Sequence, residues 1–98
     1  MDARDDRYLR LMGRCINERR CLLQMSQAQL AVAAGLSRTE IHNIEHGRTS
    51  EKVTTMIRLC AALKMGYIEL VAHMDFIMAH PEFETPCHAM KTRRGAKR

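Results

Sequence analysis

A chain of 98 residues with 46% hydrophobic side chains suits one small domain with a single core, and a peptidase domain with a lid and a substrate cleft would be cramped in it. Two Tyr and two Phe are the only aromatic residues beside abundant Met, Leu, Ala and Ile, a composition that favours helices over strands. The net charge is +5, but residues 91–98 hold five of the sixteen Lys and Arg, so residues 1–90 carry eleven basic and eleven acidic side chains. We therefore expect an all-α domain that is not broadly basic, and any nucleic-acid surface must come from local arrangement.

The N-terminal segment MDARDDRYLR is charged where a signal peptide would need an apolar core. The chain also has no run of about 18 apolar residues for a membrane span. We therefore expect a cytoplasmic protein that does not enter membranes. Residues 1–6 are polar and are expected to be a disordered N-terminus, after which Leu9, Met12 and Ile16 recur at helical spacing. This spacing predicts a first helix from about Arg7 to Cys21.

The start and stop signals of a short helix occur twice in succession. Each set contains a capping Ser, a Gln or Glu three residues later, a pair of apolar residues that forms a hydrophobic staple, and a terminal Gly. The two sets are Ser26, Gln29, Met25 with Leu30, and Gly35, and then Ser37, Glu40, Leu36 with Ile41, and Gly47. They predict helices over 27–34 and 38–46, joined by a turn of about three residues around Gly35, which is the pattern of a helix-turn-helix.

The rest of the chain predicts two more helices and a tail. Five apolar residues at helical spacing indicate a fourth helix that faces the core: Val53, Met56, Ile57, Cys60 and Leu63. The segment GYIELVAHMDFIMAH fits a fifth helix stopped by Pro81, although residues 67–72 taken alone also fit a short strand. Residues 81–98, with two prolines and a basic end, are expected to be a flexible basic tail. The predicted domain therefore covers residues 7–80.

Helical geometry gives the third predicted helix a polar face. At 100° per residue, one side carries Arg38, Thr39, His42, Asn43 and His46. Ile41 and Ile44 lie opposite and can anchor the helix to the core. Arg offers a bidentate fork to guanine, Asn can pair with adenine, and Thr can meet a thymine methyl. This face therefore has the groups needed to read base edges in DNA.

The run SQAQLAVAAGLSRTEIHNIEHGR resembles the lambda-repressor/Cro-type helix-turn-helix regulators, the XRE family. The resemblance covers about residues 11–72 and implies a five-helix, lambda-repressor-like DNA-binding domain, with 27–34 as the positioning helix and 38–46 as the recognition helix. It implies base-reading roles for Arg38, Thr39, His42 and Asn43, phosphate contacts for Gln27, Ser37, Arg48 and Thr49, and a structural ion pair between Arg20 and Glu45. The sequence departs from the family pattern at Gln24, which replaces the usual turn glycine, and at Glu51, Cys60 and Gly66.

Residues 42–46, HNIEH, also fit the H-x-x-E-H pattern of some zinc peptidases. A zinc site would need His42 and His46 on a long helix, a third protein ligand, and a water held by Glu45. Gly47 ends the predicted helix at the second His, and the resemblance gives Glu45 a structural role. The four cysteines show no C-x-x-C spacing and are expected to be free thiols. We therefore expect no metal, no cofactor and no enzymatic activity.

These observations predict a sequence-specific transcriptional regulator, a repressor that binds a palindromic operator as a homodimer. A single module of this size makes few base contacts, and two recognition helices about 34 Å apart double the site. The predicted dimerisation residues are Tyr67, Ile68, Val71 and Met74. The alternative is an antitoxin that regulates its own gene through the helix-turn-helix and binds a toxin protein through residues 67–98.

Overall fold

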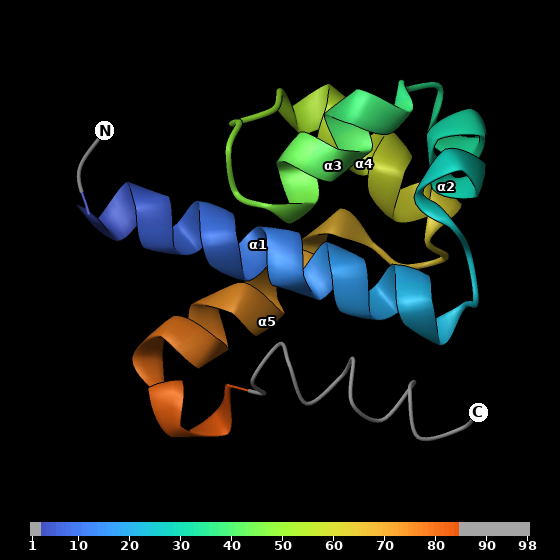
Figure 1. The fold of residues 1–98 in the computed structure, drawn as a ribbon. Helices are drawn as coiled ribbons and strands as arrows, with labels where there is room; N and C mark the ends of the chain where they lie inside the picture. The colour runs from blue at the N-terminus through green and yellow to red at the C-terminus, as the bar shows by residue number, and fades with distance from the viewer. Residues whose placement is uncertain (1–2, 85–98) are drawn as a thin grey trace, which may run out of the picture.

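The computed structural model describes residues 3–84 and is helical throughout its regular structure (Figure 1). The α-helices are α1 (Ala3–Leu22), α2 (Gln27–Ala34), α3 (Arg38–Glu45), α4 (Val53–Ala62) and α5 (Tyr67–Ala79), and a short 3-10 helix, η1 (Pro81–Phe83), follows. No strand occurs between residues 3 and 84. The predicted all-α, five-helix fold is therefore confirmed, and residues 67–72 are helical.

The ends of the domain differ from the expected boundaries. α1 begins at Ala3, because Asp5 and Asp6 in its first turn interact favourably with the positive end of the helix dipole. The expected disorder of residues 1–6 is therefore corrected for residues 3–6. The expected tail is corrected in the same way for residues 81–84, since η1 folds back and Glu84 forms an ion pair with Arg14. The rest of that tail, residues 85–98, lies outside the described residues.

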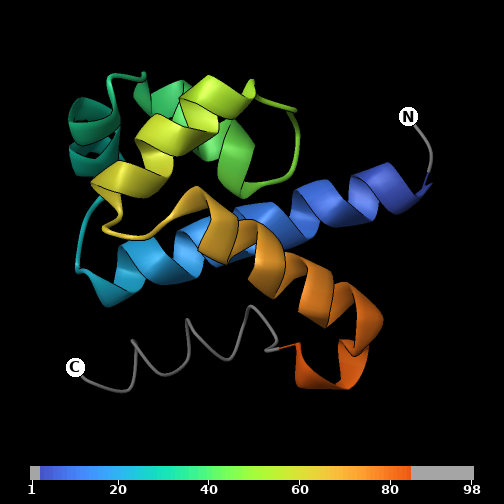
Figure 2. The ribbon, with the colours of Figure 1, turned by 180° about the vertical axis from the view of Figure 1, so that it is seen from behind.

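The long helix α1 separates two groups of elements. In both ribbon views, α2, α3 and α4 lie together on one side of α1, while α5 runs along its other side (Figures 1 and 2). The most deeply buried side chains come from four of the helices and from the residue that follows α4: Ile16, Leu30, Ile41, Ile44, Met56, Leu59, Cys60 and Leu63. Burial of each large aliphatic side chain contributes about 1.5–3 kcal/mol to folding. None of the helices described between residues 3 and 84 is long and apolar enough to span a bilayer.

A glycine allows α1 to approach the end of α3 closely. A Cβ atom placed on Gly13 would lie 2.5 Å from the carbonyl oxygen of Ile44 and closer still to that of Glu45. Both neighbours are backbone atoms, which cannot rotate away as a side chain could. Gly13 therefore sets the distance between α1 and the C-terminal end of α3, a role that the sequence analysis did not identify.

Two turns place non-glycine residues in the left-handed region. Gln24 has φ +59° after α1, at the position where the family pattern has glycine, and Lys64 has φ +57° after α4. Arg19 stabilises the second turn by donating hydrogen bonds to the carbonyl oxygens of Leu63 (2.8 Å) and Lys64 (3.0 Å). Left-handed backbone costs a non-glycine residue roughly 1 kcal/mol or more. Gln24 therefore introduces strain into the turn that leads into α2.

Candidate nucleic-acid interface

The α2–turn–α3 unit is built from the two predicted capping boxes. Ser26 Oγ accepts a hydrogen bond from the Gln29 backbone N–H (3.0 Å), and Gln29 Oε1 accepts one from the Ser26 N–H (2.7 Å). Ser37 and Glu40 form the same reciprocal pair at 3.0 and 2.8 Å. Between the two helices Gly35 has φ +72°, the left-handed conformation that ends α2. The predicted helix-turn-helix is therefore confirmed.

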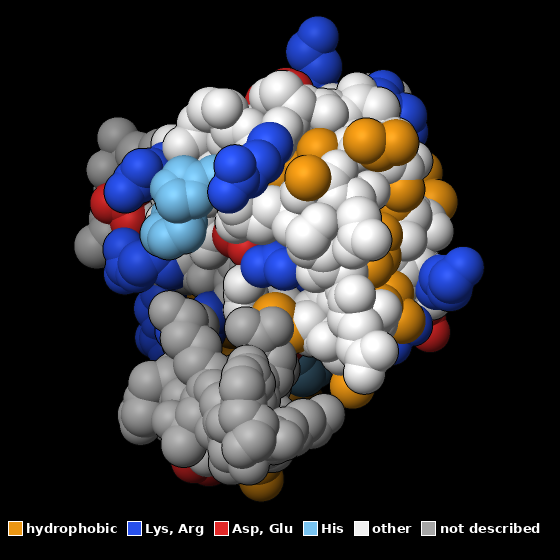
Figure 3. All heavy atoms as spheres, turned by 45° about the vertical axis from the view of Figure 1, so that its right-hand side comes forward, with side chains coloured by type: hydrophobic (Ala, Val, Ile, Leu, Met, Phe, Trp, Pro, Cys, Tyr) orange, Lys and Arg blue, Asp and Glu red, His pale blue; other side chains and the backbone are white. Residues whose placement is uncertain are grey.

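The predicted base-reading residues lie on the outer face of α3. Arg38 and Thr39 are exposed, and His42 and Asn43 are half-buried. Ile41 and Ile44 on the opposite face are both 0% exposed. Figure 3 shows histidine side chains lying among Lys and Arg side chains on this face of the molecule. The helix thus presents donors and acceptors to solvent while two fully buried isoleucines fix its position.

Glu45 anchors the same helix through a buried polar network. Its carboxylate accepts two hydrogen bonds from Arg20, from Nε (2.6 Å) and from an Nη (3.0 Å), and Arg20 also donates to the Met25 carbonyl (2.8 Å). Asn17 Nδ2 (3.0 Å) and Gln27 Nε2 (3.1 Å) donate to the same carboxylate. The network therefore ties α3 to α1 and to the start of α2.

The electrostatics of this network keep both partners charged. Burial on its own would raise the pKa of the Glu45 carboxyl, but the hydrogen bonds from Arg20, Asn17 and Gln27 outweigh it and hold the pKa below its usual range. The hydrogen bond to Glu45 raises the pKa of Arg20 despite the opposing effect of its burial. Within residues 3–84, no buried side-chain polar atom lacks a hydrogen-bond partner. The ion pair is therefore fully satisfied, which a buried pair needs in order to be tolerated.

The residues expected to contact phosphates differ in whether their side chains already make hydrogen bonds within the domain. Ser37 is exposed and its Oγ accepts the capping bond, so its hydroxyl proton can still donate to a phosphate. Arg48 is exposed, and its backbone N–H donates to the Asn43 carbonyl (2.9 Å). Gln27 already donates to Glu45, and Thr49 donates to Glu51 (3.2 Å). The side chains of Ser37 and Arg48 therefore keep more donors free of hydrogen bonds within the domain than those of Gln27 and Thr49.

The arrangement of HNIEH does not suit a zinc peptidase. The rings of His42 and His46 lie side by side on the outer face of α3, with centroids 4.1 Å apart. Glu45 is buried and bound to Arg20, so its carboxylate cannot hold a water molecule between the two histidines. α3 ends at Glu45, and Gly47 follows with φ +68°. The glutamate of the motif therefore serves the fold of the domain.

Only part of the predicted dimerisation set is accessible on α5. Ile68 is 79% exposed and Val71 is 43% exposed. Met74 is 8% exposed and belongs to the core, and Tyr67 packs partly against that core. Met74 is therefore corrected to a core residue, because it lies about 240° around the helix from Ile68. Phe76 is 49% exposed and extends the apolar surface of α5 instead.

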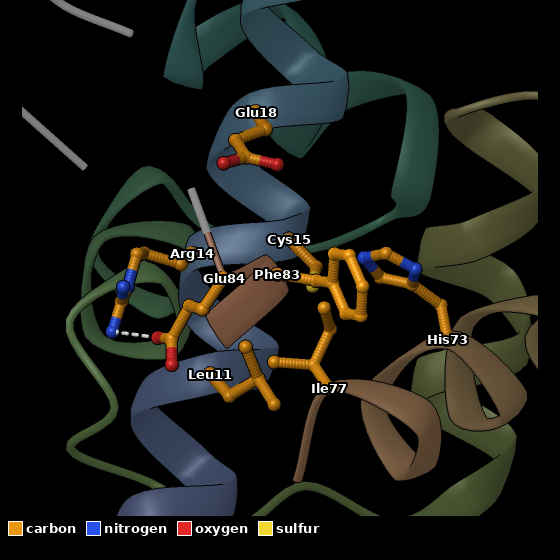
Figure 4. Close-up of a pocket in the computed structure, with 8 residues that line it drawn as sticks. All are labelled: Leu11, Arg14, Cys15, Glu18, His73, Ile77, Phe83 and Glu84. Atoms are coloured by element: carbon orange, nitrogen blue, oxygen red, sulfur yellow. Dashed lines mark ion pairs between the residues drawn. The ribbon is translucent and has the colours of Figure 1, made fainter. Parts of the chain in front are cut away.

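The segment after α5 packs against α1 beside a small pocket. Figure 4 shows Phe83 and Glu84 lying close to Cys15, with the Glu84 carboxylate directed at Arg14. The pocket has a volume of about 120 Å³ and lies on the α5 side of α1. Phe83 also stacks on Phe76, with ring centroids 5.6 Å apart. Residues 67–84 are therefore folded onto the domain, whereas residues 85–98 of the segment considered for toxin binding lie outside the described residues.

The helix-turn-helix and the surrounding domain are similar to known proteins in both sequence and structure. A family model described as Helix-turn-helix matches residues 16–70. Over 71 residues the chain is 38% identical to RghRB of Bacillus subtilis (strain 168), which is described as an uncharacterised HTH-type transcriptional regulator. The match covers 71% of this chain and 51% of RghRB, so the chain spans about half the length of that relative. The fold is similar to the crystal structure of the restriction-modification controller protein C.AhdI from Aeromonas hydrophila (TM-score 0.62, 29% identity), over 63% of this chain and 94% of that one.

Proposed function

The chain belongs to the XRE-type helix-turn-helix family, and on that premise we propose that it is a sequence-specific DNA-binding transcriptional regulator that represses transcription in the cytoplasm. The proposal depends chiefly on one observation. The polar side chains of Arg38, Thr39 and Asn43 project from a short helix whose other face is locked by two fully buried isoleucines. Fixed side chains on a rigid helix are what recognition of base edges requires.

Each side chain has a distinct role in this proposal. The Arg38 guanidinium donates two hydrogen bonds to guanine, and the Asn43 amide pairs with adenine in the major groove. Ser37, which caps the start of α3, and Arg48, three residues after its end, bind phosphates and set the register of the helix on the duplex. The activity is binding without catalysis, and repression follows when the bound protein blocks access to the promoter.

We propose that the protein binds a palindromic operator as a homodimer through α5. The exposed apolar side chains Ile68, Val71 and Phe76 lie on this helix, which is on the far side of α1 from α3. Contact between two copies of α5 would leave both α3 helices free to face DNA. Pairing two recognition helices about one DNA turn apart, roughly 34 Å, doubles the sequence that is read.

Selection of bound duplexes from a random library at near-physiological salt tests DNA reading. We expect a palindromic consensus. On that sequence, Arg38→Ala or Asn43→Ala should each cost about 1–3 kcal/mol and relax specificity at one base pair. Arg48→Ala should instead weaken operator and random DNA alike and flatten the dependence of affinity on salt. Equal losses on operator and random DNA for all three variants would contradict the assigned roles.

Light scattering of two matched variants tests the dimer. Ile68→Glu places a charge on the proposed interface, and Val32→Glu places one at a similarly exposed site on α2 (79% and 84% exposed). We expect a dimer mass for the wild type and for Val32→Glu, and a monomer mass for Ile68→Glu. A dimer mass for both variants would move the interface away from α5.

A further inference from the structure

Two histidines form a pair on the outer face of α3. The base contacts proposed for Arg38 and Asn43 do not require this pair. His42 and His46 are one helical turn apart, His46 is exposed and His42 is half-buried. Their ring centroids are 4.1 Å apart and the ring planes are inclined by 31°. Two imidazoles at i and i+4 on one face of a helix are a recognised arrangement for binding a transition metal. Such binding requires a ring nitrogen with a free lone pair on each histidine.

The hydrogen bonding of His46 meets this requirement for one ring. His46 Nδ1 lies 2.9 Å from the backbone carbonyl oxygen of His42. A carbonyl oxygen can only accept, so Nδ1 carries the proton in this bond, and Nε2 of the neutral ring holds the free lone pair. Metal-binding histidines characteristically donate their second ring N–H to a carbonyl or carboxylate, which fixes the ring and its tautomer. His46 is therefore already oriented as a ligand.

We propose that His42 and His46 together chelate a late first-row divalent cation such as Zn²⁺, Ni²⁺ or Cu²⁺. With metal–nitrogen bonds of about 2.0–2.1 Å and tetrahedral angles, the two ligating nitrogens lie about 3.3 Å apart. In such a complex the two ring centroids lie about 5 Å apart. The observed centroid separation is 4.1 Å, so the rings must move apart by about 1 Å, which rotation about the side-chain bonds provides. Imidazole is the ligand that these cations prefer among neutral side chains.

The remaining coordination positions are filled by water. Among residues 3–84, no group of three or more His, Cys, Asp or Glu side chains could hold a metal ion. Glu45, the nearest acidic residue in sequence, is held in the core by Arg20. A site with two protein ligands binds a metal reversibly, unlike the closed four-ligand sites that stabilise folds. The proposed ion is therefore a dissociable effector.

A metal ion bound by the His42–His46 pair would lie on the surface proposed to contact DNA. This step rests on the proposed function, in which the outer face of α3 enters the major groove. A hydrated ion held between His42 and His46 occupies the space into which base edges must come. Metal and operator DNA therefore compete for one surface, and each must lower the affinity for the other by the same factor.

Titration of the whole chain with NiCl₂, and then with ZnCl₂, in a calorimeter tests the site without DNA. His42→Gln and His46→Gln each leave one imidazole of the pair, and His73→Gln and His80→Gln remove exposed imidazoles from α5 and its end. All four variants keep every cysteine, so any binding by thiols is common to them. We expect at least a tenfold loss of Ni²⁺ affinity in the first two variants and no change in the other two. Unchanged Ni²⁺ affinity in the His42→Gln/His46→Gln double variant would overturn the proposal.

Operator binding with and without saturating Ni²⁺ tests the competition. We expect the wild type to lose at least tenfold in operator affinity, with recovery on adding EDTA, and His46→Gln to lose none. Operator affinity that Ni²⁺ leaves unchanged in the wild type would overturn the competition. Failure to bind any operator in metal-free buffer would count against the proposed function alone, because the calorimetric titration contains no DNA.

Discussion

Glu45 offers the sharpest test of how the recognition helix is held. Its side chain is 2% exposed and that of Arg20 is 11% exposed, and the two are joined by hydrogen bonds of 2.6 and 3.0 Å. Glu45→Ala removes the acceptor for Arg20, Asn17 and Gln27 together and leaves the guanidinium buried without its counter-charge. Breaking a buried pair in this way costs about 3–5 kcal/mol. Small domains have roughly 5–15 kcal/mol in total, so a large share of the stability should be lost.

Two further variants separate charge from shape. Glu45→Gln keeps the shape and one acceptor oxygen, so the loss should be about 1.5–3 kcal/mol, the contribution of hydrogen bonds to a charged group. Glu40→Gln is the control, because Glu40 is an exposed acid on the same helix and glutamine can still accept from the Ser37 N–H. Its loss should stay below about 1 kcal/mol. The double variant Arg20→Met/Glu45→Leu should be more stable than Glu45→Ala, since it buries no unpaired charge.

Urea unfolding followed by circular dichroism measures these differences as shifts of the midpoint at constant slope. The same assay at low pH tests the electrostatic reasoning. Because the folded-state pKa of Glu45 lies below its usual range, the ion pair contributes stability above the unfolded value of about 4.3 and loses it as the pH falls through the folded value. Wild type should therefore lose more stability than Glu45→Gln below about pH 4. Equal losses for Glu45→Gln and Glu40→Gln at neutral pH would refute the account.

Three other perturbations test packing, strain and thiol reactivity. Gly13→Ala should lower the free energy of unfolding by more than about 2 kcal/mol, because the new Cβ would meet the backbone of α3. This loss exceeds the gain of up to about 1 kcal/mol that alanine brings to a helix. Thermal unfolding measures the difference. Gln24→Gly should increase the free energy of unfolding by about 0.5–1 kcal/mol, because it relieves the left-handed strain. Urea unfolding should then show a higher midpoint, and a lower midpoint would contradict this. Burial raises the pKa of the partly exposed Cys15 to about 12 and that of the buried Cys60 to about 11, so both thiols should react with Ellman's reagent much more slowly in the native state than after unfolding. Reaction of either thiol in the native state at the unfolded rate would contradict this.

Features of the fold that depend on local signals could be predicted from the sequence. Each capping box needs only a Ser and a Gln or Glu three residues apart, and both boxes form with the expected hydrogen bonds. The left-handed turn at Gly35 is local for the same reason. The fifth helix was harder, because residues 67–72 also suit a strand. Its length and its continuation to Ala79 identify it as a helix.

Features that depend on a neighbour in space were missed or misplaced. Nothing in the sequence around Gly13 indicates that the carbonyl groups of α3 will lie against it. The folding of Pro81 to Glu84 onto α1 likewise depends on Arg14, nearly seventy residues earlier in the chain. Met74 is different, since the helical angle from Ile68 already separates it from the exposed face. The burial of Met74 therefore follows from the helical pattern of the sequence alone.

Stability and base reading are joined at the C-terminal end of α3. The backbone of Glu45 lies against Gly13, while its carboxylate binds Arg20 and Gln27, so this residue fixes α3 relative to both α1 and α2. Asn43 and His42 lie within one turn of it and share its position on the helix. A shift of α3 therefore displaces base contacts, which need precise hydrogen-bond geometry, more than phosphate contacts, which tolerate movement. Variants at Gly13 and Glu45 that still fold should consequently lose discrimination between operator and random DNA before they lose binding, whereas Arg48→Ala should lose binding before discrimination.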